Sequence, residues 1–324
     1  MNFTRLDFTT CSDRPMAATI GFFDGLHLGH RHLIDQLKTV ADERGLCTMA
    51  VTFGRHPRKV LKTDYRPQLL TDTAEKTTLL RQSGLDACTL LDFTTQMAAM
   101  TAREFMTEIL MGQLGVKVLL MGYDHHFGCD RGLGFDDYQT IGRSCGMEVI
   151  QATPLIVDGQ AVSSSRIRRL VAEGSIQAAA RLLGRYYAIG GTVTEGHKVG
   201  RQLGFPTANI QPADAERLIP SSGVYAVWAE AGGRYHEAML NIGHRPTLHN
   251  GNDLSIEAHL FDFADNLYGQ HLTLHLVDRL RDERQFDSLD SLAQQIGRDA
   301  EQTLNLLKQC SNPSSYFSDL SSTR

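Results

Sequence analysis

The chain has 324 residues, 42% of them hydrophobic, and a formal net charge of −5. This length suits two domains better than one, and the apolar share is sufficient for ordinary cores. The negative balance gives no general attraction to nucleic acid or to anionic membranes. The N-terminus lacks the apolar core of a signal peptide, and no apolar run is long enough to span a bilayer. We therefore expect a soluble cytoplasmic protein without nucleic acid or membrane partners.

Six cysteines are spread along the chain without a Cys-x-x-Cys pair. They are Cys11, Cys47, Cys88, Cys129, Cys145 and Cys310. This spacing argues against both a disulfide framework and a structural zinc site. We expect reduced thiols, which suits the cytosol.

The first predicted element is a buried strand at residues 16–20, which a glycine-rich turn follows. Apolar residues spaced from Leu33 to Val40 then predict the core face of a helix. The turn, Gly-Phe-Phe-Asp-Gly-Leu-His-Leu-Gly-His at residues 21–30, contains three glycines that let the backbone approach a ligand closely. The helix start adds unpaired N–H groups and a partial positive charge. Phosphate fits such a turn.

Two histidines distinguish this turn from the common phosphate loops. The turn lacks the Lys-Ser/Thr of a Walker A loop and the Gly-x-Gly-x-x-Gly spacing of a dinucleotide fingerprint. Instead, His27 and His30 lie at the helix start, where two ring N–H donors can point at one anion. Local hydrogen bonding at a helix end is the alternative, but the neighbouring glycines favour an anion site.

Buried strands alternate with helices through the rest of the first half. This order indicates a parallel sheet with helices on both faces, whose ligands bind beyond the carboxyl ends of the strands. A proline predicts a loop after the second strand. This loop contains His56 and several basic residues, and it lies on the ligand side because it follows the carboxyl end of the strand. The predicted strands cover residues 46–53, 87–92 and 116–121, and the predicted helices cover 72–82 and the segment that follows a capping box at Thr101.

Two further segments of the first half contain candidate ligand-binding residues. Residues 122–128 follow a predicted strand and include a histidine pair, but adjacent residues rarely point at one metal ion and no third ligand is suitably spaced. We therefore expect no zinc there. Residues 162–168, Val-Ser-Ser-Ser-Arg-Ile-Arg, place hydroxyls and guanidiniums at a helix start. These groups favour an anion site, with a capped surface helix as the alternative.

After residue 184 the pattern changes to short β-rich segments, and we place the domain boundary there. Several alternating strands joined by turns suggest a small closed antiparallel barrel. An amphipathic helix that starts near Ser288 should pack across it. The predicted strands cover residues 187–194, 223–230, 235–242, 254–260 and 271–277. The predicted domains are 1–184 and 185–310, followed by a flexible Ser-rich tail at 311–324.

Residues 200–210, Gly-Arg-Gln-Leu-Gly-Phe-Pro-Thr-Ala-Asn-Ile, are predicted to form a loop between the first two of these strands. Thr207 and Asn209 offer two neutral oxygen ligands, which suit Mg²⁺ and phosphate rather than zinc. A lone Thr-x-Asn is usually a local turn, so the pair alone indicates little. Glu257 lies on the polar face of its strand, opposite Ile256 and Ala258, where a surface glutamate is the simpler interpretation.

These motifs resemble those of two enzyme families. The first turn resembles the nucleotidylyltransferase signature, and its full form resembles FAD synthetase, as do residues 52–57, 122–128 and 162–168. Residues 200–210 closely resemble the riboflavin kinase signature, which segments 241–247, 256–263 and 280–286 continue in family order. The chain departs from these patterns at His125, Ser165 and Leu248. The order of the two signatures resembles that of the bacterial bifunctional riboflavin kinase/FAD synthetases.

The resemblance implies that the barrel phosphorylates riboflavin to FMN with MgATP. The α/β domain would then adenylylate FMN to FAD with release of pyrophosphate. Glu257 would take the proton of the riboflavin hydroxyl, while His27 and His30 would stabilise charge on the triphosphate. The implied ATP-binding residues of the first domain are Gly21, Phe23, Asp24, Gly25, His27, His30, Ser164, Ser165 and Arg168, with His56, Asp124 and Phe127 at the flavin or nucleotide. Those of the second domain are Gly200, Arg201, Pro206, Thr207 and Asn209 for ATP and Mg²⁺, and Glu257, Arg281 and Phe286 for riboflavin.

Two other functions compete with this interpretation. One is a monofunctional adenylyltransferase with a non-catalytic barrel, against which Thr207, Asn209 and Glu257 argue. The other is a nucleic-acid-binding protein, against which the net charge and the lack of an interleaved basic and aromatic stripe argue.

Overall fold

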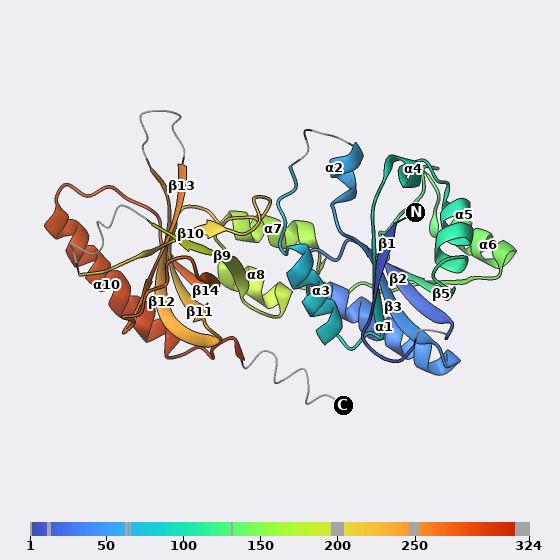
Figure 1. Ribbon diagram of the computed structural model, residues 1–324, viewed down its shortest axis with the longest axis horizontal. Coiled ribbons are helices and arrows are strands. Elements are labelled where there is room, and N and C mark those ends of the chain that lie inside the picture. Colours follow the sequence, from blue (N-terminus) through green and yellow to red (C-terminus); the bar gives the residue numbers. More distant parts are fainter. Residues whose placement is uncertain are drawn as a thin grey trace. The chain divides into compact units, whose positions relative to one another are not determined.

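The computed structural model describes residues 2–11, 14–61, 64, 66–130, 132–195, 204–245 and 253–314, which fall into two compact units (Figure 1). The first unit comprises Met1–Ser164 and the second Ser165–Arg324. Helices α7 (Ser164–Ala172) and α8 (Ile176–Leu183) therefore group mainly with the second unit. The sequence pattern placed both helices before its boundary at residue 184. The division between the two activities at that residue stays a prediction.

The first unit is built on one six-stranded sheet with the order β1-β4-β3-β2-β5-β6. Strands β2 to β6 pair in parallel, as expected, whereas β1 runs antiparallel to β4 at the edge. The edge strand was not predicted, because its short sequence Phe-Thr-Arg-Leu-Asp lacks a continuous apolar run. The strands are β1 (Phe3–Asp7), β2 (Met16–Ile20), β3 (Cys47–Phe53), β4 (Ala87–Leu91), β5 (Val116–Met121) and β6 (Glu148–Gln151).

Helices cover both faces of this sheet. Alternate residues of β2 point to opposite faces, so Ala17 packs in one core with α1 and α3, and Ala18 packs in the other with η1 and α6. The prediction of a parallel α/β sheet with helices on both sides is confirmed. The helices are α1 (Leu28–Arg44), α2 (Pro57–Leu61), α3 (Thr73–Gln82), α4 (Thr95–Ala98), α5 (Ala102–Glu104), the π-helical η1 (Phe105–Met111) and α6 (Phe135–Cys145).

Helix α2 replaces the loop expected at Pro57. Proline breaks a helix interior, but at the first helical position its missing N–H costs nothing and its fixed φ favours a helical start. Pro57 occupies that first position. A small hairpin of β7 (Ile156–Val157) and β8 (Gln160–Ala161) completes the unit.

The second unit is a closed antiparallel barrel with the strand order β10-β13-β12-β11-β14-β9. Ile256, Ala258 and Leu260 of β13 are buried together, as the alternating pattern predicted. Helix α10 (Leu289–Leu307), which Ser288 caps, packs against β11, β12 and β14 (Figure 1). The strands are β9 (Tyr187–Thr194), β10 (Ala208–Pro212), β11 (Gly223–Ala231), β12 (Arg234–Arg245), β13 (Asp253–Leu260) and β14 (His271–Arg281).

Strand β10 was expected to be loop. The glycines and the proline before it obscured its start, yet Asn209 pairs with Thr194 of β9 and with Glu257 of β13. The barrel therefore closes through the motif that carries Thr207 and Asn209.

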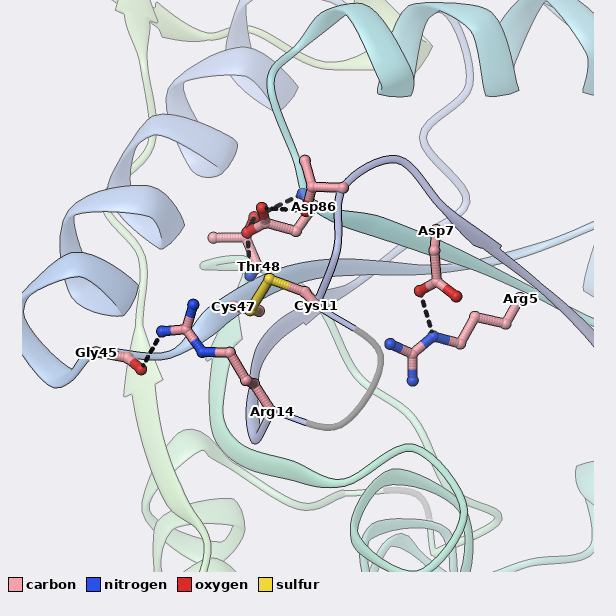
Figure 2. Close-up of a disulfide and its surroundings, with 9 residues drawn as sticks. Arg5, Asp7, Cys11, Arg14, Gly45, Cys47, Thr48 and Asp86 are labelled. Carbon is pink, nitrogen blue, oxygen red and sulfur yellow. Dashed lines mark hydrogen bonds and ion pairs between the residues drawn. A yellow bond between two sulfur atoms is a disulfide. The ribbon is translucent and has the colours of Figure 1, made fainter.

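A disulfide joins Cys11 to Cys47, with the two Sγ atoms 2.03 Å apart (Figure 2). The expectation of reduced thiols is therefore wrong for this pair, while Cys88, Cys129, Cys145 and Cys310 are free. The two residues are 36 positions apart in sequence. Cys11 lies between β1 and β2, and the parallel pairing of β2 with β3 places the start of β2 beside Cys47. Within the described ranges, a metal-like grouping occurs at Cys11, Cys47 and Asp86, but its sulfurs are bonded to each other.

Hydrogen bonds around the disulfide fix the same corner of the sheet (Figure 2). The Asp86 carboxylate accepts from the Thr48 N–H and hydroxyl, each at 2.8 Å, and from the Thr9 hydroxyl at 2.8 Å. These bonds hold the pKa of Asp86 below its usual value, against the effect of burial. The corner lies at the amino end of β3, about 20 Å along that strand from its carboxyl end.

Reduction of the disulfide should therefore lower the stability of the first unit without altering the carboxyl ends of its strands, where ligands are expected to bind. Opening a loop of this size should lower the free energy of unfolding by about 3 to 4 kcal/mol, because the unfolded chain regains entropy. Urea unfolding with and without dithiothreitol measures the effect, and Cys11→Ala should remove the dependence on reductant. A wild-type midpoint that reductant leaves unchanged would contradict the expected contribution.

Candidate functional site

The turn between β2 and α1 adopts a backbone that side chains rarely tolerate. Gly25 has a φ of 80°, while the non-glycine residues Phe23 and Leu26 have φ values of 54° and 29°. Such conformations persist only where the surroundings fix them. Both side chains are buried in the core shared with α1, which holds the turn in place.

Asp24 anchors this turn from inside. Its side chain is 2% exposed, and Oδ1 accepts the backbone N–H groups of Leu70 at 2.8 Å and Thr71 at 3.1 Å. The Gly25 N–H in turn donates to the Thr71 hydroxyl at 3.0 Å. Asp24, expected at the phosphate, thus shapes the turn through the segment that precedes α3.

His27 and His30 stand at the start of α1. His27 is the N-cap, and its Nδ1 accepts the His30 N–H at 3.3 Å, so in the neutral ring the proton resides on Nε2. The two rings stack with centroids 3.7 Å apart. A side chain at Gly29 would come within 2.8 Å of the Val162 carbonyl oxygen and 3.1 Å of the His27 ring. Glycine is therefore required for this packing.

The serine motif begins beside the same turn. The Ser164 hydroxyl, at the first residue of α7, donates to the Asp24 carbonyl at 2.9 Å. Ser165 and Arg168 follow within α7, in the second unit, and their phosphate contacts remain predictions.

Two of the residues expected at the flavin or nucleotide make aromatic contacts. The His56 ring lies edge-on against Phe22, with centroids 4.6 Å apart, and its Nδ1 accepts the Arg58 N–H at 3.2 Å. Phe127 packs against Phe105, and its backbone exchanges two hydrogen bonds with the Tyr138 hydroxyl. Asp124 is exposed.

Lys76 of α3 is a residue that sequence reasoning missed. Its side chain is 2% exposed, and Nζ donates to the carbonyl oxygens of Phe53 at 2.7 Å and Phe22 at 3.3 Å. Burial lowers its pKa to about 8, although the Asp24 carboxylate acts in the opposite direction. A lysine three residues before the paired leucines Leu79 and Leu80 was the available sequence signal.

In the barrel, cross-strand pairing aligns three polar residues. Glu257 of β13 lies opposite Asn209 of β10 on one side and Asn241 of β12 on the other. Residues directly opposite in antiparallel strands share a face, so a carboxylate stands between two amides. The polar position of Glu257, inferred from alternation, agrees with this register.

Two hydroxyls hold the Glu257 carboxylate. Ser255 Oγ donates to Oε1 at 2.6 Å, and Thr207 Oγ1 donates to Oε2 at 3.2 Å. Ser255 is buried two residues before Glu257 on the same face of β13. Ser255 was not predicted from the sequence, although its spacing from Glu257 was a usable signal.

Two cavities of about 340 Å³ each meet at Thr207. Such volumes suit small-molecule ligands. Thr207 lines both, while Pro206 and Leu260 belong to the first and Glu257 to the second. The first cavity also contains Val193, Ala208, Ala258, Phe263, Ala264, Asp265, Asn266, Leu267 and Tyr268. The second contains Phe205, Val224, Met239, Asn241, His259, Arg281, Glu283, Arg284, Phe286, Leu292, Ile296 and Asp299.

An ion pair between the partly buried Arg281 and the buried Asp299 forms one wall of the second cavity. Arg281 Nη2 lies 2.7 Å from Asp299 Oδ2, and Arg281 Nε also donates to that carboxylate. Gln295 adds a bond to Asp299 at 2.7 Å, and the Arg281 guanidinium lies 5.8 Å from the centre of the Phe286 ring. The structure thus brings together Arg281, Phe286 and Glu257. Gly200 and Arg201 lie outside the described residues.

Comparison with known proteins identifies both units. Residues 10–166 match the FAD synthetase family and residues 183–307 match the riboflavin kinase family. The chain is 38% identical over 286 residues to the bifunctional riboflavin kinase/FMN adenylyltransferase of Pseudomonas fluorescens, covering 88% of this chain and 91% of that protein. This chain belongs to the bifunctional riboflavin kinase/FMN adenylyltransferase family.

Other relatives extend the same match. The enzyme of that name from Bacillus subtilis is 32% identical, with 93% of this chain and 92% of that protein covered. A solved structure from Streptococcus pneumoniae, titled a macrolide-efflux protein, is 31% identical with a TM-score of 0.83. The match covers 90% of this chain and 95% of that one. Among the described residues, no helix is long and apolar enough to cross a membrane.

The family assignment makes this chain an ATP-dependent transferase of flavin cofactor biosynthesis. It has an adenylyltransferase domain in its α/β half and a kinase domain in its barrel. The cavity pair at Thr207 lies within the riboflavin kinase domain, as does the ion pair of Arg281 with Asp299.

Asp299→Ala should destabilise the kinase domain. The substitution leaves the Arg281 guanidinium without its carboxylate, and breaking such a pair costs about 3 kcal/mol when the remaining charge is largely buried. Thermal unfolding monitored by circular dichroism measures the loss, with Glu301→Ala, an exposed change on the same helix, as the control. Equal unfolding temperatures for the two variants would contradict the assigned contribution.

Proposed function

We propose that this chain converts riboflavin to FMN in the barrel and FMN to FAD in the α/β unit, with ATP as co-substrate of both steps. The observation that carries the kinase assignment is the meeting of two cavities at Thr207, with Glu257 lining one of them. A nucleotide in the first cavity and an isoalloxazine in the second would place phosphate and alcohol on either side of Thr207.

In the kinase step, Glu257 takes the proton from the riboflavin 5′-hydroxyl as that oxygen attacks the γ-phosphorus. Ser255 and Thr207 hold the carboxylate in position, so the base is oriented before the substrate binds. The wall formed by Arg281 and Phe286 supplies a flat surface for the flavin ring.

Mg²⁺ fits this site by the chemistry of its donors. Thr207 and Asn209 would hold the ion, because they supply neutral oxygens beside a carboxylate, the set that hard cations prefer. When bound, the ion neutralises charge on the ATP phosphates.

In the adenylylation step, the FMN phosphate attacks the α-phosphorus of ATP and pyrophosphate leaves. The N-terminus of α1 and the ring N–H groups of His27 and His30 donate to the phosphate oxygens as charge moves onto pyrophosphate. No covalent enzyme intermediate is required, so catalysis rests on position and charge. Ser164, Ser165 and Arg168 complete the proposed triphosphate site, with His56, Asp124 and Phe127 toward the flavin or nucleotide.

We assign the chain to the cytoplasm, where riboflavin and ATP are available together. The disulfide between Cys11 and Cys47 would then be exposed to thiol reductants, and four further cysteines are free. Incubation of the protein with riboflavin, ATP and Mg²⁺ tests the whole proposal by chromatography, which should show FMN first and FAD later. Absence of FMN would refute the kinase assignment.

Glu257→Gln should separate the two activities. The amide keeps the volume and accepts hydrogen bonds but cannot take a proton, so FMN formation should fall by about 10² to 10⁴. Supplied FMN should still become FAD at close to the wild-type rate. Both half-reactions are measured on one preparation, with Glu237→Gln, on β12 outside both cavities, as the control. Undiminished riboflavin phosphorylation would remove Glu257 from the mechanism.

His30→Ala should impair only the adenylylation step. Loss of one preorganised donor at the triphosphate should lower the FAD rate by about 10² to 10³, so that FMN accumulates. His32→Ala, on the same helix, is the matched control. A normal FAD rate from FMN in His30→Ala would overturn this role.

A further inference from the structure

The buried lysine of α3 is the starting point, because lysine is among the residues least often fully buried. Lys76 is enclosed on every side, with its ammonium 4.2 Å from the centre of the Phe22 ring. The groups around it are the Asp24 carboxylate from the β2–α1 turn and the Cys88 thiol from β4. Burial raises the pKa of Cys88 to about 12, so that thiol is neutral at physiological pH.

The two carbonyl groups that Lys76 binds belong to different strand ends. Phe53 is the last residue of β3, and Phe22 lies just beyond the end of β2. The Phe22 carbonyl also accepts the Thr52 hydroxyl at 3.2 Å. One ammonium therefore ties together the carboxyl ends of two adjacent parallel strands, at the edge where open α/β sheets bind ligands.

These strand ends lead into the two segments with nucleotide-site residues. Beyond Phe22 comes the turn with His27 and His30, and beyond Phe53 comes the loop with His56, whose ring contacts Phe22. The segment before α3 already holds that turn through Asp24 and Gly25. Lys76 adds one donor that binds both Phe22 of the turn and Phe53, the last residue before the loop.

We propose that Lys76 is a positioning residue of the adenylyl-transfer site, which sets the spacing between the histidine turn and the His56 loop. This inference rests on the proposed adenylyltransferase function. A positively charged donor is suited to the role because charge-assisted bonds to two carbonyls are stronger than neutral ones. The ammonium also adds positive charge behind the turn proposed to hold the triphosphate.

Lys76→Met in the full chain tests the proposal, since methionine has a similar length and no donor. The kcat for FAD formation from FMN should fall by about 10- to 100-fold, because small displacements of reacting groups are costly. The KM for ATP and for FMN should change by less than threefold. Riboflavin phosphorylation on the same preparation should stay within twofold of wild type.

The control is Lys38→Met on α1 of the same unit, which removes an ammonium that donates to Asp35 and to the Ser83 carbonyl rather than to either strand end. It should leave both activities unchanged. A folded Lys76→Met protein with wild-type kcat for FAD formation overturns the proposal. So does a loss shared equally by both activities, which would indicate a general structural role.

If Lys76→Met does not fold, Lys76→Gln decides the question. The shorter glutamine amide reaches one carbonyl at most, so a folded variant should lose at least about fivefold in kcat for FAD formation. An unchanged kcat overturns the proposal. A wild-type chain that makes no FAD from FMN would instead refute the proposed function itself, so the two failures are distinguishable.

Discussion

The first unit depends on a buried carboxylate that binds backbone N–H groups. Asp24 holds Leu70 and Thr71, and through them it fixes a turn in which Phe23 and Leu26 adopt left-handed backbone conformations. Without such a partner, these conformations would cost about 1 to 3 kcal/mol each. The start of α1, the stacked histidines and the contact with Ser164 all follow from the path that this turn takes.

In the barrel, the register of the paired strands positions the polar residues. Antiparallel pairing of three strands places Asn209, Glu257 and Asn241 in one row, and no strained backbone is required. Hydroxyls from β13 and from Thr207, the residue before β10, then restrict the carboxylate between them. The α/β unit thus positions groups with a turn and helix ends, whereas the barrel positions them with strand pairing.

Much of this arrangement was predictable, because it follows from the spacing of apolar and polar residues within short segments. Continuous apolar runs identified β2, β3 and β5, and alternation identified the inward face of β13 and so the outward side of Glu257. The carbonyl partners of Lys76 and the pairing of Asp299 with Arg281 were not predictable, because each contact joins residues distant in sequence. The pairing of Cys11 with Cys47 belongs to the same class, since it depends on the path of the chain before β2 and on the pairing of β2 with β3.

The closure of the barrel also bears on how the protein is made. Its first strand, β9, pairs with its last, β14, and α10 supplies Asp299 to the cavity wall after every strand has been synthesised. The α/β sheet, by contrast, is complete once β6 has left the ribosome. Because domains fold as units during synthesis, the adenylyltransferase half can reach its native state while the kinase half still lacks its final strand and helix.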